Sequence, residues 1–436
     1  MSLSVLSGLI ILVLLVIMLI AGVPIAVALG ISSVCAILPV MDLNVAVVTG
    51  AQRIFSGISV FSLLAIPFFI LAGNIMNKGG IAIRLINLAK IVTGRTPGGL
   101  AQTNILANAL FGAISGSGTA AASAMGSIIG PIEKDEGYDP NFSAAANIAT
   151  APTGLLIPPS NVMITFSLVS GGTSVAALFM AGYIPGALWA LACMLVVYIY
   201  AKKAGYRSQT KLTGKEKFNA FIQALPCLLL IVIVIGGIIA GVFTATEGSV
   251  VAVVYSLLLS IYGYKSMKWK DLPEIFQSSA EMTGIIIFLI GVSSIMSWVM
   301  AFTNIPTMVS NGLLSISSNK YVILLMINII LLVVGTFMDM TPATLIFTPI
   351  FLPVCTALGM NTIHFGIMLI FNLCIGTITP PVGTTLFVGV KVGGVKIETV
   401  FKHLLPYFFA IIVVLMLVTY IPQLSLWLPG LMGYVS

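Results

Sequence analysis

Two proline pairs, Pro158-Pro159 and Pro380-Pro381, interrupt long apolar stretches of this chain at positions 222 residues apart. A proline has no amide hydrogen to donate and its ring blocks the helical hydrogen-bond ladder, so neither stretch can form one regular helix. Non-helical backbone is tolerated at membrane depth only where protein or a water-filled cavity surrounds it. Two helices broken at corresponding places in two halves of a chain are typical of the binding site of a secondary transporter.

The composition indicates that this chain is an integral membrane protein. Hydrophobic residues make up 59% of the 436 residues and charged residues only 7%, so the charge is too sparse to cover a soluble fold of this size. The net charge of +7 comes from cations in the loops between apolar runs, which indicates membrane orientation and argues against nucleic acid as a partner. The first apolar run has no basic segment before it and leads directly into a second, so we expect a retained helix and not a signal peptide. Apolar runs long enough to cross predict full spans at 4–21, 23–40, 59–76, 174–200, 224–243, 246–264, 282–303 and 404–428.

Two further apolar stretches carry a polar interruption in their middle. Segment 98–132 is interrupted at Ser115-Gly-Ser-Gly-Thr119, and segment 321–356 is interrupted around Asp339. Each half is shorter than the ~20 residues that a membrane crossing takes. We interpret both segments as helical hairpins that enter the membrane and return to the same side.

The stretches with the proline pairs, 141–172 and 361–393, are then single crossings that unwind near 150–160 and 376–384. Sliding the first half onto the second at an offset of 222 aligns both proline pairs and several glycines without a gap. Because the residues that match are mostly those that set backbone breaks, we interpret the halves as a structural repeat. With the hairpins entering from opposite sides, the repeat is inverted.

The distribution of cations supports this topology. With the loop 201–220 in the cytoplasm, only Arg53 and Lys320 fall on the outer side, and both termini face outward. The other 17 of the 19 cations lie inside, as the positive-inside rule requires: Lys78, Arg84, Lys90, Arg95, Lys134, Lys202, Lys203, Arg207, Lys211, Lys215, Lys217, Lys265, Lys268, Lys270, Lys391, Lys396 and Lys402.

The hairpin tip and the helix break of the first half carry its candidate substrate- and ion-binding residues. Glycines let backbone approach a ligand closely, and hydroxyls with freed carbonyls form an oxygen shell that suits Na⁺. The half-helix that begins after the prolines offers amide groups to a carboxylate. The alternatives are small-residue helix packing for the tip and a simple kink for the break. The candidates are Ser115, Gly116, Ser117, Gly118, Thr119, Asn147, Thr150, Thr153, Gly154, Pro158, Pro159, Ser160 and Asn161.

The second half repeats this arrangement and adds a carboxylate at membrane depth. An acid there is costly unless it meets a cation, a proton or water, so Asp339 is a candidate ion ligand. The alternative is a capping residue at the start of a helix. The candidates are Gly335, Asp339, Thr341, Thr344, Gly376, Thr377, Thr379, Pro380, Pro381, Gly383 and Thr384. At the two tips we expect Na⁺ ions, two or more in all and without an organic cofactor, held by Ser117, Thr119, Gly154, Asp339, Thr341 and Thr379.

Two other polar residues have simpler interpretations. Glu247, in the loop between two spans, is best explained by helix capping or a subunit contact. Asn74 lies within a span and is interpreted as a hydrogen-bonding link between helices, with a weaker case for a site.

The motifs Ile114–Pro131, Gly154–Ser160, Ala181–Gly186 and Gly241–Glu247 resemble the large membrane subunit of tripartite ATP-independent periplasmic (TRAP) transporters. The resemblance covers essentially the whole chain. It implies an all-α polytopic protein of the bacterial inner membrane, an inverted-repeat elevator with two re-entrant hairpins and two broken helices. It also implies Na⁺-coupled import of an organic acid, a small four-helix membrane subunit and a periplasmic substrate-binding protein. The small subunit is absent from this chain and should be a separate one.

The resemblance also implies a division of the chain and a substrate. Thr119-Ala-Ala-Ala122 stands where carriers of C4-dicarboxylates typically have an acid, and with Pro152–Asn161 it is more similar to the sialic-acid branch. We therefore expect sialic acid first and a C4-dicarboxylate next. The expected parts are scaffold at 1–76 and 173–303, arm helices at 77–97 and 304–320, a transport domain at 98–172 and 321–394, and a C-terminal helix at 395–436.

Three other functions stay open at this point. A stand-alone Na⁺/dicarboxylate elevator carrier would share the hairpins and the inverted repeat. An intramembrane enzyme needs a paired acid or a Ser-His pair at depth, and Asp339 has no acidic partner in the opposite half. A channel would need neither two broken helices nor two hairpins.

Overall fold

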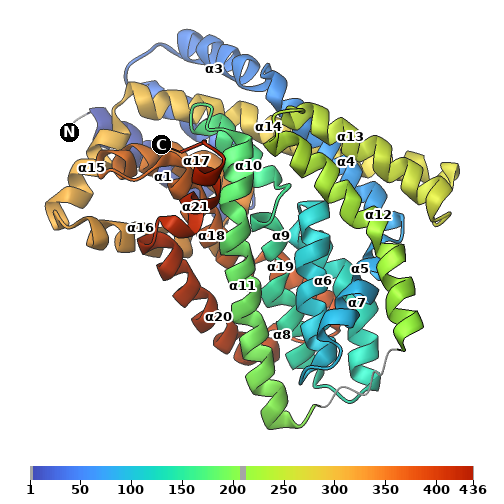
Figure 1. Cartoon of the computed structure of the whole chain (residues 1–436). Helices are drawn as coiled ribbons and strands as arrows, with labels where there is room; N and C mark the ends of the chain where they lie inside the picture. Colours follow the sequence, from blue (N-terminus) through green and yellow to red (C-terminus); the bar gives the residue numbers. More distant parts are fainter. Residues whose placement is uncertain (1–2, 207–212, 436) are drawn as a thin grey trace.

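The computed structural model describes residues 3–206 and 213–435, and every regular element within these ranges is a helix (Figure 1). The elements in chain order are α1 (Leu3–Ile20), α2 (Ile25–Ile37), α3 (Leu43–Ile58), η1 (Phe61–Leu64), α4 (Ala65–Lys78), α5 (Ile81–Thr93), α6 (Gly99–Ser115), α7 (Gly118–Asp135), α8 (Pro140–Thr150), α9 (Thr153–Leu156), α10 (Asn161–Val169), α11 (Val175–Ala204), α12 (Gly214–Ile239), α13 (Ala245–Leu258), η2 (Leu259–Gly263), η3 (Trp269–Asp271), α14 (Leu272–Phe302), α15 (Ile305–Ile316), α16 (Lys320–Gly335), α17 (Met340–Ala357), α18 (Thr362–Thr377), α19 (Thr384–Gly393), α20 (Ile397–Tyr420) and α21 (Gln423–Leu431).

Eight helical segments within the described ranges are long and apolar enough to cross a membrane. They are Leu3–Ile20, Phe61–Lys78, Val175–Ala204, Gly214–Ile239, Ala245–Gly263, Trp269–Phe302, Met340–Ala357 and Ile397–Tyr420. A ninth candidate consists of Pro140–Leu156 and Asn161–Val169, which meet the same criterion together and bend by 47° at the break between them. Length and composition therefore confirm a multi-pass membrane protein with one bent span at the first proline pair.

The structure corrects one predicted span near the N-terminus and adds a helix after it. The stretch 23–40 contains only the 13-residue helix α2, which begins after Pro24 and ends two residues before Pro39. No span was predicted over 43–58, where polar residues divide the apolar residues into short runs, and the helix α3 that lies there is not among the candidate spans. Its apolar side chains, Phe55 among them, are largely exposed.

Two further spans differ from the prediction at their ends. Helix α12 begins at Gly214, ten residues before the apolar run, because Thr213 and Glu216 form a capping box that starts a polar first turn. The stretch 404–428 is not one helix, since α20 ends at Tyr420 before Pro422 and α21 follows. In addition, each hairpin half was predicted to be too short to cross a membrane. Helix α17 has 18 residues and is long enough to count as a candidate span.

We call α2, α3, α4, α13 and α14 the outer group of helices, and α6 to α10 together with α17 to α19 the inner group (Figure 1). In the outer group α2, α3 and α4 pack against α14, and α13 packs against α4. In the inner group α6 packs against α7, and α17 packs against α18. The two halves interleave there, because α19 lies against α7 and α8 while α10 lies against α17. The larger of the two hydrophobic clusters fills the inner group.

Helix α5 connects the two groups. Its apolar residues Ile81, Leu85, Ile86 and Ala89 are buried against α6 and α12, while Arg84 leaves this face. The guanidinium of Arg84 donates a hydrogen bond to the Gly80 carbonyl oxygen at 2.6 Å. It also lies 3.5 Å above the ring of Tyr264, in the loop after η2. A cation over an aromatic ring is attracted by its negative face, so α5 is fastened to the outer group at this point.

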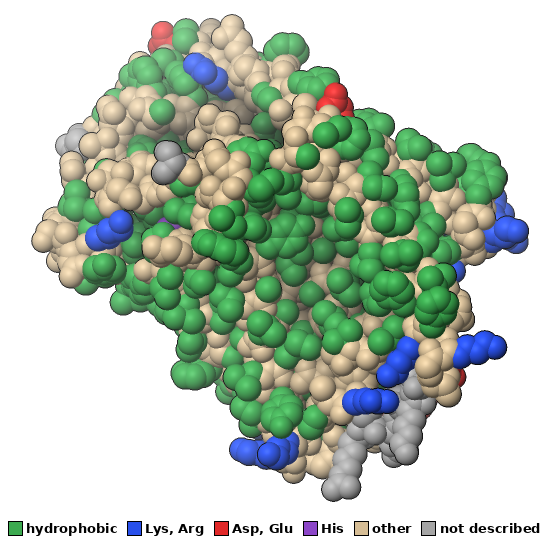
Figure 2. Space-filling model, viewed as in Figure 1, with side chains coloured by type: hydrophobic (Ala, Val, Ile, Leu, Met, Phe, Trp, Pro, Cys, Tyr) green, Lys and Arg blue, Asp and Glu red, His purple; other side chains and the backbone are tan. Residues whose placement is uncertain are grey.

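The face of the molecule in Figure 2 is apolar along its middle. Figure 2 shows a broad band of hydrophobic side chains, with most Lys and Arg side chains in view at the lower and right-hand ends. A band of this kind is the surface that a bilayer requires of a membrane protein.

Candidate functional site

The tip of the first hairpin lies against the first helix break. Helix α6 ends at Ser115, Gly116 takes a left-handed conformation at φ 61°, and α7 begins at Gly118. A Cβ added to Gly154 in α9 would lie 2.1 Å from the Cα atom of Gly112, so the two backbones are in direct contact. A Cβ at Gly116 would lie 3.1 Å from the carbonyl oxygen of Pro159. The structure therefore brings the predicted tip and break of the first half together.

A buried amide ladder holds this hairpin to α8. The Nδ2 group of Asn108 lies within hydrogen-bond distance of three acceptors: Asn104 Oδ1 at 2.6 Å, Asn147 Oδ1 at 3.0 Å and Thr150 Oγ1 at 3.2 Å. Asn147 in turn donates to the carbonyl oxygen of Ala122 in α7 at 2.8 Å. Two predicted site residues, Asn147 and Thr150, thus position the hairpin helices from their place beside the break.

Several oxygens at the first tip and break are available to a ligand. The hydroxyls of Ser117 and Thr119 lie 3.1 Å apart, and Ser117 Oγ accepts a hydrogen bond from the amide of Ala120 as the N-cap of α7. Ser160 Oγ and Asn161 Oδ1 are buried and have no hydrogen-bond partner. Buried polar atoms without a protein partner are uncommon, so these two oxygens are candidates to bind a ligand.

The second tip and break meet in the same way. A Cβ at Gly376, near the end of α18, would lie 2.4 Å from the carbonyl carbon and oxygen of Gly335, the last residue of α16. The amide of Val382 donates to the carbonyl oxygen of Thr336 at 3.1 Å. The break itself covers residues 378–383, between α18 and α19, and includes Thr379, Pro380, Pro381 and Gly383.

Asp339 connects the second tip to the second break. Its backbone is in the N-cap position of α17, but its side chain makes no capping hydrogen bond. Instead its Oδ1 atom accepts a hydrogen bond from the hydroxyl of Thr384, the first residue of α19, at 3.2 Å. Asp339 is exposed, whereas Thr344, one turn along α17, is buried and its Oγ1 atom has no partner. Thr341 is half-buried between them.

Other predicted site residues serve their own helices. The hydroxyl of Thr379 donates to Ile375 O at 2.7 Å, and that of Thr377 donates to Cys374 O at 2.8 Å. The hydroxyl of Thr153 donates to Thr150 O at 2.7 Å. Each of these hydroxyl oxygens keeps lone pairs, so local bonding does not remove it as a possible cation ligand.

The two simpler interpretations from the sequence are confirmed. Glu247 forms a capping box with Thr244, whose amide donates to Glu247 Oε2 at 2.8 Å. Asn74 Nδ2 donates to Ser279 Oγ on α14 at 2.8 Å, which links two helices of the outer group.

Three polar residues of this region were not predicted from the sequence to belong to the site. Asn372 Nδ2 on α18 donates to Asn328 Oδ1 on α16 at 2.6 Å, a counterpart of the Asn108 ladder in the second half. Thr385 lies beside the first tip, because a Cβ at Gly118 would be 3.3 Å from its hydroxyl oxygen. An asparagine inside an apolar run was the available signal for the first two. Nothing in the local sequence of Thr385 points to a contact with the opposite half.

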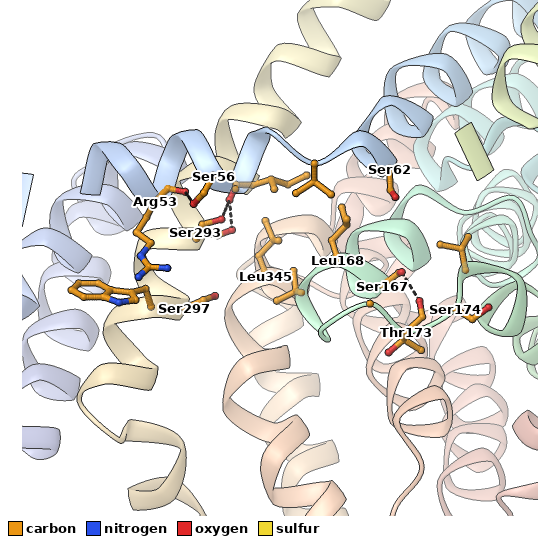
Figure 3. Close-up of a pocket in the computed structure, with 18 residues that line it drawn as sticks. Arg53, Ser56, Ser62, Ser167, Leu168, Thr173, Ser174, Ser293, Ser297 and Leu345 are labelled. Atoms are coloured by element: carbon orange, nitrogen blue, oxygen red, sulfur yellow. Dashed lines mark hydrogen bonds between the residues drawn. The ribbon is translucent and has the colours of Figure 1, made fainter. Parts of the chain in front are cut away.

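A cavity of about 690 Å³ separates the outer group from the inner group. Hydroxyl side chains border it from both sides, and its only charged lining residue is Arg53. Figure 3 shows Ser293 and Ser297 of α14 facing Ser167, Thr173 and Ser174 of the α10–α11 region across it. The guanidinium of Arg53, on α3, stands 5.2 Å from the ring centroid of Trp298. Arg53 was not predicted as a site residue, because it is more than a hundred residues from Ser167 in the sequence.

Within the described ranges, no three residues of the types His, Cys, Asp and Glu gather into a metal site. A cation at either tip would accordingly be held mainly by hydroxyl, amide and carbonyl oxygens, with Asp339 as the acid at the second tip.

Broken helices, paired tips and an apolar lateral surface define a membrane transport protein. The chain matches the family described as "Tripartite ATP-independent periplasmic transporter, DctM component" over residues 12–424, and it therefore belongs to this family. Because this is a family of transporter permeases, the chain is not an intramembrane enzyme.

Three relatives show how the chain is placed within the family. "Uncharacterized protein YgiK" of Salmonella typhimurium is 53% identical over 95% of both chains. "Isethionate TRAP transporter permease protein DctMQ" of Oleidesulfovibrio alaskensis is 38% identical over 94% of this chain and 65% of its own length. "Sialic acid TRAP transporter large permease protein SiaM" of Vibrio cholerae is 38% identical over 88% of this chain and 90% of its own. Since relatives named for different acids are equally similar, identity does not single out the sialic-acid branch.

The fold is similar to that of a solved transporter. The crystal structure of the Alcanivorax borkumensis YdaH transporter aligns with a TM-score of 0.64 over 100% of both chains, at 13% sequence identity. At this identity the likeness concerns the fold alone, and it confirms an all-helical polytopic transporter architecture.

Proposed function

We propose that this chain is the permease of a Na⁺-driven importer that moves a small organic acid by an elevator mechanism. The observation that carries the proposal is the matched pair of backbone contacts, Gly112 with Gly154 and Gly335 with Gly376. In both halves a hairpin tip is pressed against an unwound helix. Residues 98–172 and 321–394 would move together as the transport domain against a scaffold of the remaining spans.

A contact between equivalent positions supports an inverted repeat. The thiol of Cys374 lies 3.8 Å from the carbonyl oxygen of Pro152, and these residues are 222 positions apart, the offset of the repeat. Equivalent residues touch each other only near a symmetry axis, so a pseudo-two-fold axis would pass between them. Re-entrant hairpins entering from opposite sides follow from such an axis.

Na⁺ would bind at both tips. Ser117, Thr119 and the unpartnered Ser160 Oγ provide oxygens at the first, and Asp339 with Thr344 Oγ1 provides them at the second. Bound Na⁺ would neutralise Asp339 and satisfy buried oxygens that have no partner in the protein, so occupancy would stabilise a closed tip.

The substrate would enter the cavity between scaffold and transport domain. One guanidinium, that of Arg53, matches one carboxylate, and a wall of serine and threonine hydroxyls matches a polyol. This arrangement favours a sugar acid such as sialic acid over a C4-dicarboxylate, which would present a second carboxylate to a cavity with one cation among its lining residues.

Two partners follow from the proposal. A small membrane subunit would accompany this chain, since the relative named DctMQ extends well beyond the length that this chain matches. A periplasmic binding protein would deliver the acid on the outer side, where both termini, Arg53 and the cavity would face. A carrier that works without partners remains the alternative.

Co-reconstitution of this chain with its small subunit tests the proposal. We expect uptake of labelled sialic acid into proteoliposomes to require both the binding protein and an inward Na⁺ gradient. Full uptake without the binding protein would establish the stand-alone carrier instead. Uptake that ignores Na⁺ would remove the ion sites at the tips, and selective uptake of a C4-dicarboxylate would reject the sugar acid.

Replacing Arg53 with Gln should raise the KM for the acid about tenfold or more, because a charge-assisted hydrogen bond to the carboxylate is lost. Lys320→Gln is the matched control, since Lys320 is the other cation expected outside and does not border the cavity. Equal KM values for the two variants would show that Arg53 does not contact the substrate.

A further inference from the structure

A second polar cavity, of about 250 Å³, lies inside the inner group, away from both tips. Helices α6, α7, α8 and α19 converge on it, with Asn104, Glu133, Ser143, Asn147 and Gly393 among its lining residues. The helices are close here: a Cβ at Gly126 would lie 2.7 Å from Asn147 Nδ2 and 3.0 Å from Val392. Both halves of the chain thus contribute to one small chamber.

Glu133 is the unusual residue of this chamber. It is 0% exposed, and neither of its carboxylate oxygens has a hydrogen-bond partner. The hydroxyl of Ser143, which borders the same cavity from α8, is also buried and unpartnered. The described ranges contain two ion pairs, Lys78–Glu274 and His403–Asp139, and neither involves Glu133. An ionised carboxylate in this setting would be strongly destabilising.

Of the surrounding charged groups Lys134 borders the same cavity, but none forms an ion pair with Glu133. Lys134, Asp135 and Glu136 follow on the same helix end and are exposed. The phenols of Tyr138 and of Tyr407 on α20 lie within reach of the Glu133 charge and are neutral. Among the neighbouring helices, α6 and α8 contain no acidic or basic residue, while the basic residues of α5 and α19 are Arg84, Lys90 and Lys391. Arg84 is engaged elsewhere, at Gly80 and Tyr264, and Lys391 is exposed.

We propose that Glu133 is a proton-binding site in the core of the inner group, distinct from the Na⁺ sites at the tips. A proton fits better than a metal ion. Not even a water molecule can touch the carboxylate oxygens of Glu133, so a metal ion has no room beside them, whereas a proton needs no added volume. The proton would leave through the cavity toward the exposed Lys134 at the end of α7. Asn147 forms part of the chamber wall and of the Asn108 ladder, so the chamber adjoins the contacts that hold the hairpin to α8.

Thermal unfolding of the purified chain between pH 5 and pH 9 tests the site without any substrate. The native state holds Glu133 protonated, so its contribution to stability is present at low pH and is lost as the pH rises. The variant Glu133→Gln keeps the shape of the protonated acid and cannot ionise. We expect the unfolding midpoint of Glu133→Gln to gain on that of the wild type by on the order of 2 °C per pH unit between about pH 5 and about pH 8, and the difference to stay constant at higher pH, where this carboxyl is ionised in the folded and the unfolded chain alike.

Glu398→Gln is the control, because this exposed carboxylate at the start of α20 is not among the groups that act on Glu133 and should leave the wild-type pH profile unchanged. A constant gap between Glu133→Gln and the wild type across the pH range would overturn the proposal. A second measurement rests on the proposed function: uptake should fall with rising internal pH in the wild type and stay level in Glu133→Gln. Absence of uptake in every variant would count against the transport proposal alone, since the unfolding profiles decide the proton site independently.

Discussion

Alanine at Gly154 or at Gly376 is expected to abolish transport and to lower the stability of the folded chain by on the order of 3 kcal/mol. The new methyl carbon would lie 2.1 Å from Gly112 Cα in the first case and 2.4 Å from the Gly335 carbonyl in the second. Ordinary carbon contacts need more than 3.4 Å, so the hairpin and the broken helix would have to separate by more than 1 Å. Because the opposing atoms belong to the backbone, no side-chain rotation can relieve the overlap.

Thermal unfolding and uptake in proteoliposomes would measure both effects. Gly284→Ala on α14 is the control, since nothing lies within 4 Å of its added Cβ and alanine favours a helix over glycine by ~1 kcal/mol. Wild-type stability together with wild-type uptake in Gly154→Ala would show that the tip does not need to touch the break.

Replacement of Asp339 by Asn should raise the Na⁺ concentration for half-maximal uptake at least about tenfold, which corresponds to ~1.4 kcal/mol of lost ion binding. Asn keeps the size of the side chain and removes the only negative charge at the second tip. The fold should survive, because the Asp339 side chain makes no capping bond and is exposed. Thr119→Ala should act in the same direction at the first tip by removing one neutral oxygen, and by less.

Asp42→Asn provides the control for Asp339. Asp42 also stands at the N-cap of a helix without a side-chain capping bond, but that helix is α3, in the outer group. Its Na⁺ requirement should equal that of the wild type. If Asp339→Asn and Thr119→Ala both keep the wild-type Na⁺ dependence, the ion sites are elsewhere and the tips serve only to shape the fold.

The architecture could be predicted from residues whose effect on the backbone is local. Proline removes a donor wherever it stands, so the breaks at Pro158-Pro159 and Pro380-Pro381 followed from the sequence, as did the tip at Gly116. Span boundaries were less predictable. Helix α3 was missed because its apolar residues are interrupted, and the continuous apolar run of 404–428 concealed the end of α20 at Tyr420.

The composition of the site depended on distance in sequence. Asn147 could be recognised from the sequence because it stands beside its break. Its contact with Asn108 could not, because the two residues are 39 positions apart in the chain. Arg53 and Ser167 border one cavity from separate groups of helices, and no local pattern relates them. The burial of Glu133 could not be predicted either, because a glutamate before a lysine at the end of a helix is expected to be exposed to solvent.

The sequence by itself determined an all-helical multi-pass membrane protein, a helix bent at Pro158-Pro159 and the family to which the chain belongs, because hydropathy, proline and glycine act through the backbone near them. Only the tertiary structure decided which oxygens lack partners, that Asp339 bonds to Thr384, that Arg53 faces a hydroxyl-lined cavity and that Glu133 is sealed from solvent. Burial and pairing are properties of the neighbours that packing supplies, and those neighbours come from distant parts of the chain.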